Sequence, residues 1–118
     1  MRNYLQPGKV VSLTAPVGGV VAGQPYQIGQ LLVIAQASVA ATLKFEGMTT
    51  GVFSVTKPGS QAWAEGAIVY WDDAARKFTT VAEGNLRVGC AVEAVGSGST
   101  EETGKVRLDG VARANEDT

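Results

Sequence analysis

The sequence contains no histidine and only one cysteine, Cys90, among its 118 residues. Histidine is the commonest general base and metal ligand near neutral pH. Without it, a Cys–His nucleophile cannot be assembled. A single cysteine also cannot form an internal disulfide. On a strand with Val88 and Val92, Cys90 is predicted to be a small buried hydrophobe. We therefore expect no catalytic residue, no metal site and no cofactor, and hence no enzyme.

Charged residues are also scarce. They make up 18% of the chain, and the formal net charge is −1. The ten basic residues are scattered, whereas nucleic-acid-binding proteins gather such residues on one face. No apolar run approaches the roughly 18 residues of a membrane helix, and residues 1–8 lack the apolar core of a signal peptide. The composition therefore predicts a soluble protein without a cleaved leader, with neither nucleic acid nor membrane as a partner.

Two short patterns resemble functional motifs. Residues 18–23 have the glycine spacing of a phosphate-binding loop, but Gln24 and Pro25 stand where lysine and a hydroxyl residue would contact phosphate and magnesium. The adjacent carboxylates of Asp72 and Asp73 could form a cation site with Glu65 or Glu83, yet the spacing is not that of a calcium loop. Both patterns favour turns.

The sequence does have strand-forming segments separated by glycine-rich turns. The clearest unit is a predicted hairpin, in which segments 68–71 and 78–81 flank a polar tip at 72–77. Segments 42–46 and 52–57 are expected to pair with each other. A flexible loop is expected at 96–103. The other predicted extended segments are 9–14, 20–21, 26–28, 31–35, 87–95 and 105–109.

Strand-and-turn units recur roughly every 8 to 12 residues, and helical periodicity is missing. This spacing predicts an all-β fold, namely a compact antiparallel sandwich or barrel of short strands, jelly-roll-like, with little or no helix. A chain of this length is expected to form one domain. We predict an N-terminal arm at 1–8, a β core at 9–113 and a polar tail at 114–118.

Five residues on or near the predicted central strands form a candidate interface. Tyr70, Trp71 and Trp63 are aromatic, and such residues commonly pack in cores but are also enriched at subunit interfaces. Gly89 and Ala91 are small enough to let another backbone approach closely. The sequence therefore leaves open whether the aromatic side chains belong to the core, to an interface or to a surface platform.

Several stretches, taken in order, resemble a family of small tailed-phage and prophage proteins that are described as capsid cement or head-decoration proteins. The stretches are 1–8 (Met-Arg-Asn-Tyr-Leu-Gln-Pro-Gly), 13–16 (Leu-Thr-Ala-Pro), 18–21 (Gly-Gly-Val-Val), Gly23, Trp63, Gly66, 69–72 (Val-Tyr-Trp-Asp), 77–80 (Lys-Phe-Thr-Thr), 88–91 (Val-Gly-Cys-Ala) and 104–108 (Gly-Lys-Val-Arg-Leu).

The resemblance implies a β-rich structural protein on the outer surface of an icosahedral bacteriophage head. Such a protein would be a homo-oligomer, a dimer or trimer, that bridges major capsid protein subunits and stiffens the shell against packaged DNA. It would be part of the virion and would reside in the bacterial host cytoplasm during assembly.

Two other functions stay open at this point. A carbohydrate- or surface-binding β module could use Tyr70, Trp71 or Trp63 as a stacking platform. A nucleotide-dependent recombinase is the second, because members of the family are sometimes labelled RecA/RadA-like. The sequence argues against that label, since it lacks a nucleotide loop, a parallel α/β pattern and a basic face for DNA.

Overall fold

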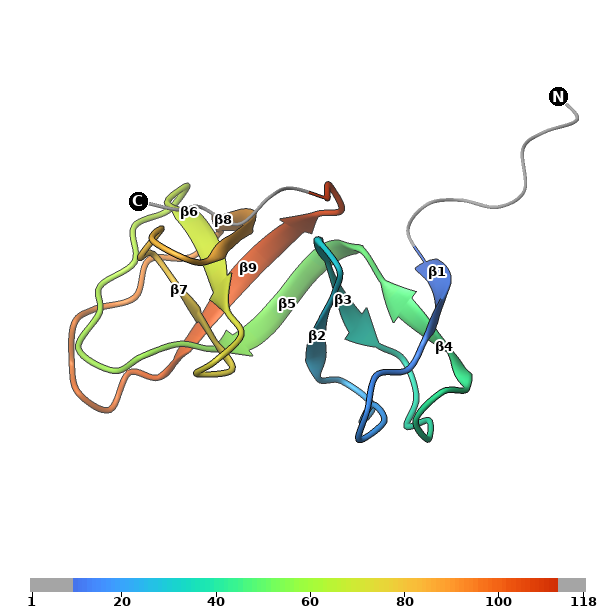
Figure 1. Ribbon diagram of the computed structural model, residues 1–118. Coiled ribbons are helices and arrows are strands. Elements are labelled where there is room, and N and C mark those ends of the chain that lie inside the picture. Colours follow the sequence, from blue (N-terminus) through green and yellow to red (C-terminus); the bar gives the residue numbers. More distant parts are fainter. Residues whose placement is uncertain (1–9, 113–118) are drawn as a thin grey trace, which may run out of the picture.

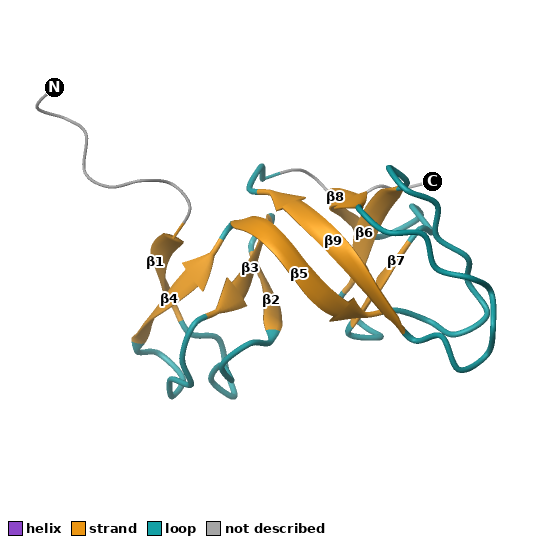
Figure 2. Ribbon diagram, turned by 180° about the vertical axis from the view of Figure 1, so that it is seen from behind, coloured by secondary structure: helices purple, strands orange, loops and turns teal. Residues whose placement is uncertain are grey.

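The computed structural model describes residues 10–112, and these residues form nine β-strands and no helix (Figure 2). The predicted all-β fold is therefore confirmed. None of the described residues belongs to a helix that could cross a membrane. The predicted arm at 1–8 and tail at 114–118 lie outside the described residues, so the division into arm, core and tail stays a prediction.

The strands are β1 Val10–Thr14, β2 Pro25–Ile28, β3 Leu31–Ala35, β4 Lys44–Met48, β5 Thr50–Thr56, β6 Ile68–Asp72, β7 Lys77–Thr79, β8 Leu86–Ala91 and β9 Thr103–Asp109.

The strands form two antiparallel sheets, each built from a continuous part of the chain (Figure 1). The first sheet has the order β1-β4-β3-β2, and the second has the order β5-β9-β8-β6-β7. A jelly roll consists of two Greek keys whose strands alternate between the sheets. Here the two halves of the chain stay separate, so the likeness to a jelly roll does not extend to the order of the strands.

The pairing predicted between segments 42–46 and 52–57 is wrong. Strand β4 pairs with β1 and β3, whereas β5 pairs along its whole length with β9. Only Thr49 separates β4 from β5, and the shortest common hairpin loops contain two residues. The chain therefore continues through Thr49, which is buried, from the first sheet into the second.

Strand β3 connects the cores of the two sheets. Its side chains alternate, so Leu32 and Ile34 pack in the main hydrophobic cluster with the second sheet, whereas Val33 and Ala35 pack on the other side with Phe45. The extended segment predicted at 31–35 is confirmed as this strand, and four of its five residues are buried. The remaining members of the main cluster are Val55, Trp63, Val69, Trp71, Phe78, Leu86, Val88, Ala91, Val106 and Leu108.

A bulge in β8 changes the faces predicted for segment 87–95. The pairing register between β6 and β8 shifts between Val69 and Tyr70, so that Val88 is an extra, unpaired residue. Beyond the bulge the alternation is reversed. Val88 and Ala91 both face the core, and Cys90 is only partly buried. The prediction that Cys90 shares a buried face with Val88 is therefore wrong.

Candidate functional site

The five residues of the candidate interface lie in two different environments. Trp63, Trp71 and Ala91 are buried in the core, whereas Tyr70 and Gly89 are partly exposed. Both tryptophans pack in the core in this conformation, and Trp71 also lines the cavity described below. An interface role for Tyr70 stays a prediction.

Gly89 is required within the sheet itself. A Cβ atom added at this position would overlap the backbone carbonyl oxygen of Arg107 on the neighbouring strand β9. Strands β8 and β9 pair directly here, with Gly89 opposite Leu108. The small residue therefore allows two strands of the same chain to approach closely, which is a different role from admitting a second chain.

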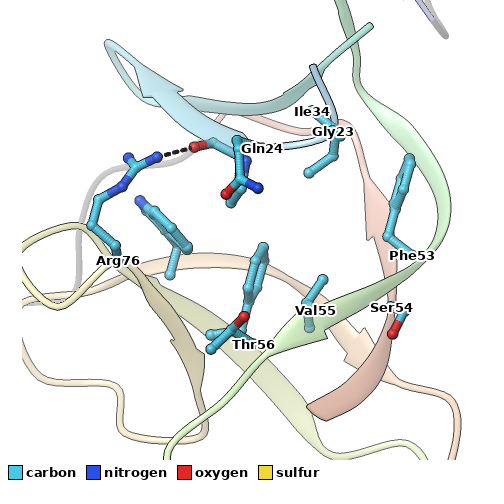
Figure 3. Close-up of a pocket in the computed structure, with 11 residues that line it drawn as sticks. Gly23, Gln24, Ile34, Phe53, Ser54, Val55, Thr56 and Arg76 are labelled. Atoms are coloured by element: carbon cyan, nitrogen blue, oxygen red, sulfur yellow. Dashed lines mark hydrogen bonds between the residues drawn. The ribbon is translucent and has the colours of Figure 1, made fainter. Parts of the chain in front are cut away.

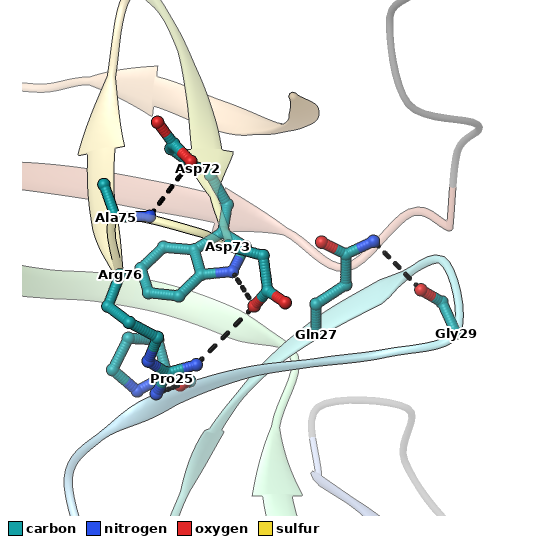
Figure 4. A network of polar contacts seen from close by, with 8 residues as sticks. Pro25, Gln27, Gly29, Asp72, Asp73, Ala75 and Arg76 are labelled. Carbon is teal, nitrogen blue, oxygen red and sulfur yellow. Dashed lines mark hydrogen bonds and ion pairs between the residues drawn. The ribbon is translucent and has the colours of Figure 1, made fainter. Parts of the chain in front are cut away.

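The predicted hairpin is confirmed as β6 and β7, and its two aspartates stabilise the turn between them (Figure 4). One carboxylate oxygen of Asp72 accepts a hydrogen bond from the Ala75 amide at 3.2 Å. Asp73 accepts one from the indole Nε1 of Trp71 at 2.9 Å. Within residues 10–112 no group of three or more Cys, Asp or Glu residues is placed to hold a metal ion. The structure therefore shows these carboxylates as turn residues.

Arg76 links this hairpin to the first sheet. Its guanidinium donates a hydrogen bond to the carbonyl oxygen of Pro25 at 2.6 Å, at the start of β2 (Figure 4). The guanidinium carbon lies 4.9 Å from the ring centroid of Tyr26 and 5.0 Å from that of Trp71. Arg76 also forms a 3.6 Å ion pair with Asp73, although exposed pairs of this kind contribute little to stability. One side chain therefore contacts both sheets.

A cavity of about 150 Å³ lies between the two sheets beside Arg76 (Figure 3). Residues of β5 form one wall, and residues at the start of β2 and in β3 form the opposite wall. Of the residues that line it, only Arg76 is charged, and none can act as a general base. The lining residues are Gly23, Gln24, Pro25, Ile34, Phe53, Ser54, Val55, Thr56, Trp71, Arg76 and Phe78.

The loop that follows β1 forms turns, as the sequence predicts for residues 18–23. The Gly19 amide donates to the Pro16 carbonyl oxygen at 2.8 Å, and the Gln24 amide donates to that of Val21 at 3.1 Å. A phosphate-binding loop of the P-loop kind joins a strand to a helix. The described strands pair antiparallel and no described helix follows this loop, so this part of the structure offers no support for a nucleotide site.

The first sheet carries very little charge. Residues 10–43 contain no Lys, Arg, Asp or Glu. At the average of 18% for the chain, these 34 residues would include about six charged ones. Lys44 and Glu46 on β4 are the only charged residues between positions 10 and 48. Depletion of charge is typical of the centre of a protein–protein interface.

Two loops at one end of the first sheet expose apolar side chains. The β1–β2 loop (15–24) and the β3–β4 loop (36–43) lie side by side (Figure 1). Two contacts join them: the Ala15 amide donates to the Leu43 carbonyl oxygen at 2.8 Å, and Val20 pairs with Val39. Their most exposed large apolar side chains, which we call the apolar tip, are Val17 (100% exposed), Val21 (55%) and Leu43 (58%).

The apolar tip was not among the residues predicted from the sequence. The uncharged run at 10–43 is the signal that could have identified it, because so long a run is unexpected in a chain of this composition. Which of its apolar residues would be exposed could not be read from the sequence. That distinction depends on how the two loops pack against each other.

Comparison with known proteins gives one clear relationship. The sequence model of a family described as phage cement protein matches residues 5–108, which is most of the chain. No curated protein and no solved structure gives a significant match.

Proposed function

This chain belongs to the phage cement protein family, and we propose that it binds the outer surface of a phage head and stabilises the shell by bridging neighbouring coat subunits. Association with the capsid of the virion follows from the family itself. The observation that carries the proposal is the family match over residues 5–108. The scarcity of charge in residues 10–48, where only Lys44 and Glu46 are charged, supports it, because such a surface suits a contact from which water is excluded.

The partner in this proposal is the major capsid protein, and the role is structural, without catalysis or binding to nucleic acid. A dimer or trimer of the chain would contact several coat subunits at once. Once one contact has formed, each further contact is effectively intramolecular, so weak individual contacts add up to firm attachment. Attachment would follow synthesis in the host cytoplasm.

Binding to purified shells tests the proposal. The protein is mixed with matured, expanded heads of its phage that lack it, and the mixture is sedimented. We expect the protein to co-sediment up to a fixed stoichiometry, and we expect the decorated shells to withstand higher temperature than bare ones. Protein that stays in the supernatant at every concentration, beside shells whose stability is unchanged, would contradict the proposal.

A further inference from the structure

We propose that the apolar tip (Val17, Val21 and Leu43) is the surface that docks on the head, and that its occupant is an uncharged, apolar patch on the coat subunits. This inference rests on the proposed function and specifies which end of the molecule contacts the shell. It follows from the conformation of Val17, the rigidity of the two loops and the distribution of charge along the chain.

Val17 is an apolar residue at the exposed corner of a turn, where its side chain has no packing role within the fold. The Gly19 amide bonds to the Pro16 carbonyl oxygen, and Gly18 has a φ of +92°. These features define a type II turn in which Val17 is the second residue, a position at which proline is common. The side chain of Val17 is fully exposed and so contributes no packing to the core. Val21 and Leu43 are exposed on the same pair of neighbouring loops, and exposed apolar residues that gather on one surface mark contacts with other molecules.

The tip is held in one shape by its backbone. The amides of Val20 and Val39 each donate to the other residue's carbonyl oxygen, at 2.9 and 3.0 Å. A Cβ atom at Gly19 would come within 2.6 Å of the Val39 carbonyl oxygen, so the two loops touch closely there. A surface that is ordered before binding loses less conformational entropy when it binds. Small side chains on such loops can therefore contribute usefully to affinity.

The charge distribution indicates which end faces the shell. Residues 49–112, which include the second sheet, contain fourteen charged residues, whereas residues 10–48 contain two. Charged side chains keep a surface soluble in water, and they lose hydration when an apolar surface covers them. The charged second sheet is therefore suited to face solvent. The two loops of the tip are themselves neutral, and exposed Lys44 follows directly after Leu43. An apolar patch matches the three aliphatic side chains, because a charge opposite them would be buried without a partner.

The size of the tip favours the coat over a second copy of the chain. A stable interface between two proteins buries about 800 Å² on each partner. Three aliphatic side chains on two loops offer only roughly a few hundred Å². A contact of that size cannot by itself hold a dimer, but it suffices on a lattice where many copies bind together.

The test compares two substitutions in the tip with a matched one elsewhere. Val17→Asp and Leu43→Asp each place a carboxylate in the proposed contact. Val52→Asp is the control, because Val52 is as exposed as Leu43 (58%) but lies on β5 in the second sheet, opposite Arg107. In co-sedimentation with expanded heads we expect each tip variant to raise the apparent Kd about tenfold or more, since a desolvated carboxylate opposes binding. Val52→Asp should stay within about twofold.

Ionic strength gives an independent readout. Salt screens a contact between charges, whereas it leaves a contact between apolar surfaces unchanged or strengthens it. We therefore expect the apparent Kd of the unmodified protein to stay the same or fall between roughly 50 and 500 mM NaCl. Weakening by about tenfold or more over this range would show a charged contact and would overturn the inference.

The outcomes separate this inference from the proposed function. If the unmodified protein binds heads and both tip variants bind equally well, the docking surface lies elsewhere, while the proposed function stands. If the unmodified protein does not bind heads, the proposed function itself fails. If Val17→Asp or Leu43→Asp changes the sedimentation coefficient of the free protein, the tip contacts a second copy, and the coat is not its occupant. Thermal unfolding of each variant tests whether the substitution leaves the fold intact.

Discussion

The guanidinium of Arg76 lies over the ring of Tyr26, with 4.9 Å between its carbon and the ring centroid, and so joins a hairpin of the second sheet to an edge strand of the first. The same side chain bonds to the Pro25 carbonyl oxygen, 51 positions away in the sequence. These contacts lie beside the cavity between the sheets. They help to fix how the first sheet, which has little charge, is oriented relative to the more highly charged second sheet.

Replacing Arg76 should therefore loosen the junction between the sheets. We expect Arg76→Ala to lower the free energy of unfolding by about 1–2 kcal/mol, through loss of the hydrogen bond from the charged guanidinium and of its cation–π contacts with two rings. Arg76→Gly should cost less, because residue 76 has a φ of +58° and glycine adopts this left-handed conformation without strain. Urea denaturation measures both. If the alanine variant were as stable as the glycine variant or more so, the left-handed backbone would not matter.

Gly89 provides a test of close packing within the second sheet. We expect Gly89→Ala to lower the free energy of unfolding by about 2 kcal/mol or more, because the added methyl group would overlap the Arg107 carbonyl oxygen and force β8 away from β9. Gly98→Ala is the matched control. Its Cβ would be 3.5 Å from the nearest atoms, which belong to the Glu101 side chain, so a change within about 0.5 kcal/mol is expected. Equal effects of the two substitutions in thermal or urea unfolding would contradict the argument.

The two tryptophans provide a test of the sugar-binding alternative. Trp63 and Trp71 are buried, and their indole nitrogens donate to Gln61 at 2.8 Å and to Asp73 at 2.9 Å. We expect their fluorescence to be shifted to shorter wavelength than that of free tryptophan, and to be quenched poorly by acrylamide. Neither property should change on titration with mono- or oligosaccharides. A saturable change would show that an indole contacts the ligand and would revive the carbohydrate-binding module.

The parts of the fold that depend on neighbouring residues could be predicted from the sequence. The hairpin of β6 and β7 and the buried strand β3 are confirmed, because alternation and turn residues act over a few positions. The partners of β4 and β5 were predicted wrongly, because pairing across the sheet brings β5 against β9, far along the chain. The bulge at Val88 depends on the register with β6, which no local pattern determines.

The candidate site was harder to predict for a similar reason. Aromatic residues are enriched both in cores and at interfaces, so composition alone could not distinguish these environments for Trp63 and Trp71, which are buried. The apolar tip consists of ordinary aliphatic residues, and a turn position such as that of Val17 does not reveal from the sequence how exposed its side chain will be. Only the fold shows that Val17 is fully exposed.

Lys57 is a fully buried lysine that holds the loop before β9 in place. Its ammonium group donates to the carbonyl oxygens of Pro58 at 2.8 Å and Glu101 at 2.9 Å, and it lies 5.7 Å from the ring centroid of Trp63. No carboxylate of residues 10–112 forms an ion pair with it. The loop at 96–103, which the sequence predicts to be flexible, is also held by a bond from the Ser60 amide to the Gly98 carbonyl oxygen.

We expect Lys57→Met to free this loop while changing the overall free energy of unfolding by only about 1 kcal/mol. Two opposing effects cause the small overall change, since the substitution removes a buried charge but leaves two carbonyl oxygens without a donor. Hydrogen exchange separates the local effect from the global one. The Ser60 amide should exchange about tenfold faster or more relative to core amides such as that of Val69. Lys105→Met is the control, because Lys105 is exposed and pairs with Glu93 at 3.2 Å. Unchanged exchange at Ser60 in the Lys57 variant would show that the loop holds its conformation without the lysine.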